Sequence, residues 1–185
     1  MGTTTAAGLM TFAEFELLPD EETKLELLEG ELIGMPPAKK KHVRASKHMF
    51  QILDPAVEAL RSRLPESGIG EVYLEMGYRM GTKPGTWLIP DVSVTHADQA
   101  GDDNYYDGAP SIAIEVASDK QNAAYLEAKA EIYLKHGARE VWMLYPKTRH
   151  VWIRRAGSST SELLTDAIRS ELLPGIEIPL DKIFD

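Results

Sequence analysis

The chain has 185 residues, of which 43% are hydrophobic and 26% are charged, so it can bury one sizeable core and is too rich in order-promoting residues to be intrinsically disordered. It contains no cysteine, which excludes disulfides, thiolate zinc sites and cysteine nucleophiles. Any metal would need oxygen or histidine ligands, which favours Mg²⁺ or Mn²⁺. The formal net charge of −9 argues against a surface that attracts nucleic acid everywhere, because phosphate binding depends on lysine and arginine.

The sequence indicates a single folded domain over residues 11–185, preceded by a flexible N-terminus at residues 1–10. No apolar run approaches the roughly 20 residues needed to cross a bilayer. The first residues have neither a basic leader nor an apolar stretch long enough for export. We therefore expect a soluble cytoplasmic protein with no membrane contact.

Two short elements are predicted near the N-terminus. Thr11 precedes the apolar residues of a helix that ends near Leu18, and Glu14 follows three residues later, which is the pattern of a capping box. Between Lys24 and Met35, two apolar stretches flank Glu29 and a glycine, which can supply the positive φ of a tight turn. This segment predicts a β-hairpin.

Apolar residues then recur at helical spacing from His42 to Leu64, and Pro55 is expected to kink or divide this helix near Asp54. A dense basic segment precedes and opens the helix. Its candidate nucleic-acid-binding residues are Lys39, Lys40, Lys41 and Arg44. The simpler interpretation of this segment, His42 included, is a solvated helix start.

The remaining pattern predicts an α/β core. Strands are expected over Glu71–Met80, Trp87–Thr95 and Ser111–Ala117, and three consecutive strands suggest a meander. A helix from about Gln121 to His136 and a strand from Val141 to Tyr145 follow, with a further strand at His150–Arg154. The core order is therefore helix, three strands, helix, strand.

Two carboxylates are candidates for a metal site. Asp91 follows Pro90, which is tolerated only at a strand edge, start or bulge, so the carboxylate lies where a strand is interrupted. Glu115 is the one charge in an otherwise buried run and needs a cation, a metal or a proton. If the two strands are neighbours, both could bind one hard cation, together with the backbone carbonyl of Val116.

A lysine on the following helix completes this hypothesis. Lys129 falls inside the apolar arc of the helix, whereas Lys135 lies on its polar side. A partly buried lysine beside two carboxylates could position a water nucleophile or stabilise charge on a phosphate. Lys120 is a competing candidate, because it is closer to Glu115 in the sequence.

Each of these residues also has a plainer interpretation. Asp91 alone could be a turn residue, Glu115 a salt-bridge partner, and Lys129 a snorkelling side chain whose amine reaches water. The charges of the hairpin are most simply surface charges; they are Glu26, Glu29 and Glu31. The combination in this order favours a site.

The order of these signals resembles the Uma-type restriction endonuclease family, long classed as a domain of unknown function, within the PD-(D/E)XK nuclease superfamily. The resemblance runs from Phe12 to about Phe184. It is carried by Leu25–Leu32, Met35-Pro36-Pro37 with His42, Pro90-Asp91-Val92, Gly108–Ser118, Lys129–Tyr133, Gly137–Trp142 and Tyr145-Pro146.

The resemblance implies a restriction-endonuclease-like fold in which Asp91 and Glu115 bind the metal, Val116 lends its carbonyl, and Lys129 is the lysine. Glu26, Glu31 and His42 would lie at the outer edge of the site. The chain departs from the pattern at Ala117, where the superfamily usually has lysine, and at Tyr125, where an acidic residue often precedes the family's lysine by one helical turn.

The resulting hypothesis is a Mg²⁺- or Mn²⁺-dependent endonuclease that hydrolyses phosphodiester bonds, with DNA as the substrate and water as the nucleophile. Cutting both strands with one site per chain would favour a homodimer. Two alternatives stay open: a non-catalytic nucleic-acid-binding or assembly module that keeps the fold, and a metal-free acid–base hydrolase that uses Asp91 and Glu115.

Overall fold

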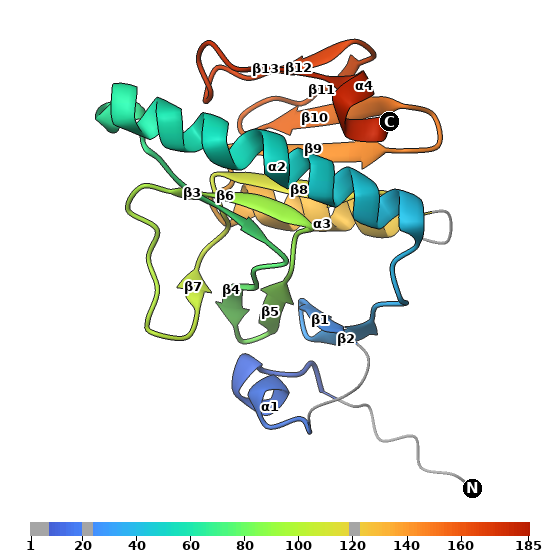
Figure 1. Cartoon of the computed structure of the whole chain (residues 1–185). Helices are drawn as coiled ribbons and strands as arrows, with labels where there is room; N and C mark the ends of the chain where they lie inside the picture. The colour runs from blue at the N-terminus through green and yellow to red at the C-terminus, as the bar shows by residue number, and fades with distance from the viewer. Residues whose placement is uncertain (1–7, 20–23, 119–122) are drawn as a thin grey trace, which may run out of the picture.

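A computed structural model describes residues 8–19, 24–118 and 123–185 of the chain (Figure 1). Its centre is a six-stranded mixed sheet in the order β11-β10-β9-β8-β6-β3. Figure 1 shows α2 (Lys40–Arg63) running across the front of this sheet, with α3 (Ala123–Lys135) behind it. The α/β class expected from the sequence is confirmed. Within the described part of the chain, no helix combines the length and apolar character needed to span a bilayer.

The two elements predicted near the N-terminus are present. Helix α1 (Phe12–Glu16) starts at Thr11, whose side chain caps the backbone N–H of Glu14 while the Glu14 carboxylate accepts from the Thr11 N–H. Strands β1 (Leu25–Leu28) and β2 (Glu31–Gly34) form the hairpin. Glu29 and Gly30 both adopt positive φ at its turn.

The sequence predicts that Pro55 kinks or divides helix α2 near Asp54; the helix is continuous through Pro55, so the division is wrong. In a helix interior, proline removes one backbone hydrogen bond and its ring clashes with the carbonyl of the preceding turn, which together cost about 3 kcal/mol. The buried face of α2, which includes Met49, Leu53, Val57 and Leu60, packs against the six-stranded sheet and offsets this cost.

The predicted meander is present as β3 (Ile69–Leu74), β6 (Val92–His96) and β8 (Ile112–Val116), which are adjacent and antiparallel. The predicted strand bounds, however, merge elements that the fold separates. Strands β4 (Tyr78–Thr82) and β5 (Gly85–Leu88) lie between β3 and β6 in the chain but join a second sheet, in the order β2-β1-β5-β4-β7, with β7 at Tyr106–Asp107. A bend at Glu75, which has positive φ, follows β3 and precedes β4.

Helix α3 connects β8 to its parallel neighbour β9 (Glu140–Tyr145). The alternation of β8 assigns its residues to two faces: Ile112, Ile114 and Val116 belong to the core under α2, and Ala113 packs in the core under α3. Glu115 therefore faces α3.

The chain closes with strands β10 (His150–Arg155) and β11 (Ser161–Leu164), which extend the large sheet, and with the small hairpin β12 (Ala167–Arg169) and β13 (Glu177–Pro179). A turn of 3-10 helix, η1 (Pro65–Ser67), follows α2, and the last helix is α4 (Leu180–Phe184). Helix α4 packs against α2. Buried residues of the β12–β13 hairpin and of α4 belong to the core under α2; they include Ile168, Ile178, Leu180 and Ile183.

Candidate metal and catalytic site

Asp91 and Glu115 meet at one end of neighbouring strands. Val92 of β6 pairs with Ile114 of β8, so the antiparallel register extended by one residue sets Asp91 opposite Glu115. Directly opposed residues carry their side chains on the same face of a sheet. Both carboxylates are buried, with exposed fractions of 8% for Asp91 and 3% for Glu115. The neighbouring strands that the sequence hypothesis required are therefore present.

The Asp91 carboxylate is held by two donors. The Val116 backbone N–H donates to Oδ2 at 2.7 Å, and His42 Nε2 lies 2.8 Å from Oδ1. Burial alone would lower the pKa of His42, but the hydrogen bond and the charge of Asp91 outweigh it and leave the pKa raised. His42 is thus suited to donate to Asp91. Among the described residues, its buried Nδ1 has no hydrogen-bond partner.

Lys129 lies between two carboxylates. Its Nζ is 2.6 Å from Glu115 Oε1 and 2.9 Å from Glu26 Oε1, and its side chain is only 1% exposed. Burial would lower the pKa of Lys129, but the two carboxylates raise it, so the amine stays protonated. The snorkelling alternative is wrong, because this amine does not reach water.

Glu26 is fully buried and accepts three hydrogen bonds. Lys129 Nζ and the Ile89 backbone N–H donate to Oε1, each at 2.9 Å, and the Tyr125 hydroxyl donates to Oε2 at 2.6 Å. The surface-charge interpretation is therefore wrong for Glu26. The surface-charge interpretation is correct for Glu29, which forms a solvent-exposed ion pair with Lys135. Glu31 is exposed on the edge strand β2 and takes no part in these contacts.

Two tyrosines of α3 complete the buried cluster, and sequence reasoning assigned neither of them a role. Tyr125 contacts Glu26, and the Tyr133 hydroxyl donates to Glu115 Oε1 at 2.8 Å. They stand four residues before and four after Lys129, so the three share one helix face. The sequence signal that could have identified them is this spacing: a tyrosine four residues before and another four residues after a lysine within the apolar face of a helix.

The environment of Glu115 raises its pKa to about 7. Burial is the main cause, and the nearby charges of Asp91 and Glu26 add to it, while the ammonium of Lys129 opposes it. Its pKa thus lies well above that of an ordinary glutamate, which is fully ionised at neutral pH. A carboxylate in this state can exchange its proton for a cation.

The donor set fits a hard divalent cation in chemistry but supplies few ligands. Asp91 and Glu115 offer carboxylate oxygens, the ligands that Mg²⁺ and Mn²⁺ prefer. From the described residues each Asp91 oxygen accepts one hydrogen bond, which leaves a second lone pair. No group of three or more acidic, histidine or cysteine side chains in the described ranges is arranged to hold an ion. A cation here would take its other ligands from backbone or water.

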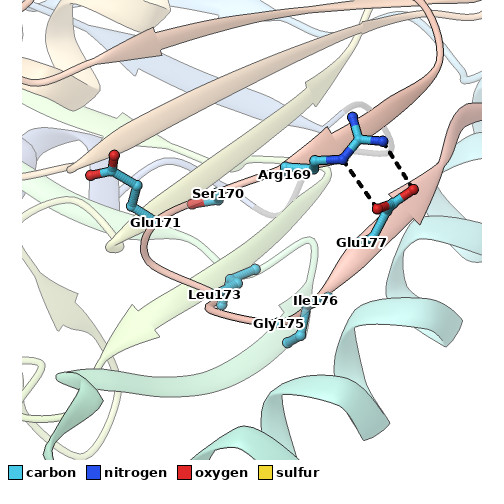
Figure 2. Close-up of a pocket in the computed structure, with 7 residues that line it drawn as sticks. All are labelled: Arg169, Ser170, Glu171, Leu173, Gly175, Ile176 and Glu177. Carbon is cyan, nitrogen blue, oxygen red and sulfur yellow. Dashed lines mark hydrogen bonds and ion pairs between the residues drawn. The ribbon is translucent and has the colours of Figure 1, made fainter.

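A hollow of about 360 Å³ lies elsewhere, at the β12–β13 hairpin (Figure 2). Its rim includes Arg169 and Glu177, which are joined by two hydrogen bonds of 3.1 and 3.0 Å. No residue of the carboxylate cluster lines it. This hollow contributes nothing to the candidate site.

Comparison with known proteins identifies the family. The model of the Uma2 family, described as "Putative restriction endonuclease", matches residues 12–181. The chain belongs to this family. The Uma2 match spans all the residues of the buried cluster, from Glu26 to Tyr133.

A solved structure supports the fold independently. The chain is similar to the crystal structure of "a putative nuclease belonging to DUF820 from Anabaena variabilis", with a TM-score of 0.78 and 20% sequence identity. The similarity covers 95% of this chain and 97% of that one. No curated protein matches the chain.

The basic segment of this Uma2 chain lies at the N-terminal end of α2, beside the cluster. Lys39 is the N-cap residue, and the side chains of Lys40 and Lys41 in the first turn are exposed, as is that of Arg44. The Arg44 guanidinium donates to the backbone carbonyl of Asp185. The competing lysine, Lys120, lies outside the described residues.

Proposed function

We propose that the chain is a divalent-metal-dependent endonuclease that hydrolyses phosphodiester bonds in DNA. The observation that carries the proposal is the buried arrangement of Asp91, Glu115 and Lys129, in which two acidic residues oppose each other and a protonated lysine lies 2.6 Å from one of them. Membership of the Uma2 family supports nuclease chemistry.

Asp91 and Glu115 would hold Mg²⁺ or Mn²⁺, with the carbonyl of Val116 as a further ligand. When bound, the cation lowers the pKa of a water molecule and offsets charge on the phosphate. His42 and the Val116 N–H fix the orientation of Asp91, as hydrogen-bond partners of metal ligands commonly do. Lys129 keeps its proton and stabilises negative charge that develops on the phosphate oxygens.

The exposed lysines at the start of α2 would contact flanking phosphates of the DNA. Lys40 and Lys41 are exposed and begin the same helix turn as His42, which reaches Asp91. This gives an acidic chain of net charge −9 a local basic footprint next to its site. Cleavage of both strands with one site per chain favours action as a homodimer.

The test is cleavage of supercoiled plasmid DNA with Mg²⁺, with Mn²⁺ and with excess EDTA, by the wild type and by Asp91→Asn. We expect nicking that requires the metal and that Asp91→Asn reduces at least about a thousandfold, because it weakens metal binding and transition-state stabilisation together. Circular dichroism confirms that the variant is folded. Undiminished cleavage in EDTA, or by Asp91→Asn, contradicts the proposal.

A second candidate is a non-catalytic module that binds nucleic acid or assembles with a partner. It is favoured by the double use of Glu115 Oε1, which is already engaged by Lys129 and Tyr133, and by Ala117 at the position where the superfamily usually has lysine. Wild-type protein that binds DNA and Mn²⁺ but cleaves no phosphodiester bond would support this candidate.

A further inference from the structure

We propose that Glu26 is a positioning residue that holds the Lys129 amine beside Glu115, so that the β1–β2 hairpin of the second sheet completes the site. The inference rests on the proposed function, because it concerns the lysine that acts there. Glu26 and Lys129 are 103 residues apart in the chain, and their contact joins the five-stranded second sheet to α3.

Lysine needs such a partner because its stem is long and flexible. A single carboxylate leaves a four-carbon side chain free to pivot about one contact. Here Nζ meets two acceptors, at 2.6 and 2.9 Å, and the ring centroids of Tyr125 and Tyr133 each lie 5.9 Å from it. The amine therefore has one position that satisfies both carboxylates.

The Glu26 carboxylate is itself held by two further hydrogen-bond donors, one from the segment after β5 and one from α3. The Ile89 N–H, just after β5, and the Tyr125 hydroxyl of α3 both donate to it. Oε1 already accepts two hydrogen bonds, which fills both of its lone-pair directions. Glu26 is thus an immobile charge directed at Lys129 and is poorly placed to be a metal ligand.

Glu115 would share its carboxylate between Lys129 and a bound cation, whereas Glu26 would serve Lys129 alone. Glu26 Oε1, which lies 2.9 Å from Nζ, is the acceptor that would hold the amine in place with a cation bound. The amine stays protonated, buried and within the site. Without Glu26, the amine would lose, among the described residues, the carboxylate partner that would not also hold the metal.

The experiment compares Glu26→Gln with a matched control, Glu140→Gln. Glu140 is also a buried carboxylate, 2% exposed, bound by Arg155 and by the Trp142 indole N–H. It pairs with Ile112, at the end of β8 away from Glu115. A double variant, Glu26→Gln/Tyr125→Glu, returns a carboxylate to the same face of α3, one turn before Lys129.

Four quantities are measured for each variant: kcat and KM on plasmid DNA, the Kd for Mn²⁺ by calorimetry, and the side-chain ¹H–¹⁵N signal of the Lys129 ammonium. For Glu26→Gln we expect kcat to fall roughly 30-fold or more, as for loss of a transition-state contact, with the Mn²⁺ Kd within about threefold of wild type. The ammonium signal is expected to disappear through faster exchange. The double variant should recover the signal and about tenfold in kcat.

The outcomes separate the alternatives. Glu26→Gln that keeps its activity and its ammonium signal, or that loses tenfold or more in Mn²⁺ affinity, overturns the positioning role. So does an equal loss of kcat in Glu140→Gln, which would trace the effect to stability. If the wild type cleaves no DNA, the proposed function fails, yet the ammonium signal still decides whether Glu26 holds Lys129.

Discussion

Replacing Lys129 with methionine removes the positive charge from between Glu26 and Glu115 while keeping the length of the side chain. The lysine lies 2.9 and 2.6 Å from the two carboxylates and is 1% exposed. Breaking a buried ion pair by removing one partner costs about 3–5 kcal/mol, because a buried charge is left uncompensated. We expect the free energy of unfolding of Lys129→Met to fall by about that amount at pH 8.

The loss of unfolding free energy in Lys129→Met should be smaller at low pH than at pH 8. The direction of this change follows from the protonation of Glu115. Its folded-state pKa of about 7 lies above the ordinary value of 4.5, so the fold favours the protonated form, and stability declines as pH rises through this window. Removal of Lys129 raises this pKa further, since the ammonium opposes protonation. At pH 5.5, below this raised pKa, we expect Glu115 to be largely protonated in both proteins, so that most of the remaining difference comes from the contact of Lys129 with Glu26.

Urea unfolding followed by tryptophan fluorescence at pH 8 and pH 5.5 measures both effects. The control is Lys135→Met on the same helix, whose pair with Glu29 is exposed by 62% and 53% and should contribute less than about 1 kcal/mol. If Lys129→Met costs no more than this control at pH 8, the buried ion-pair cluster is not a determinant of stability and the reasoning is refuted.

Three further results are expected. Because Glu115 is protonated below its pKa of about 7, the Mn²⁺ affinity should fall up to roughly tenfold per pH unit below that value. Equal calorimetric Kd values for Mn²⁺ at pH 6 and pH 8 would argue against Glu115 as a ligand. His42→Ala should weaken Mn²⁺ binding about 10- to 100-fold, because Asp91 is then no longer held in one orientation. His42→Gln retains a hydrogen-bond donor and should bind Mn²⁺ more tightly than His42→Ala. Equal Mn²⁺ affinities of the two variants would show that His42 does not support the site. Lys40→Ala/Lys41→Ala should lower the salt slope of DNA binding, measured by anisotropy, by about 1.8; an unchanged slope would show that these lysines meet no phosphate.

The sequence predicted the parts of the site that local pattern determines. A lone carboxylate in a buried strand, a proline that ends a strand before Asp91, and a lysine within an apolar helical arc are signals contained in a few neighbouring residues. The strands β6 and β8 are adjacent, and Lys129 is buried against Glu115, as the pattern indicated. The plainer interpretation of Lys129 failed because snorkelling requires a path to water.

The parts that the sequence did not predict depend on distant contacts. Glu26 lies in a hairpin whose charges alternate as surface charges do, and its burial arises only when β1 pairs with β5 and faces α3. The separation of β4 and β5 into a second sheet depends likewise on that pairing. At Pro55, tertiary packing of the buried helix face outweighs local backbone preference.

The central claim, that Asp91 and Glu115 share one cation, is tested most directly by a crystal soaked in Mn²⁺ at pH 8, where Glu115 is ionised. The anomalous scattering of manganese distinguishes the bound ion from a water molecule. We predict one ion with oxygen atoms of both carboxylates at about 2.0 to 2.3 Å. An ion bound to other residues, or no ion between Asp91 and Glu115 at saturating Mn²⁺, would contradict the account.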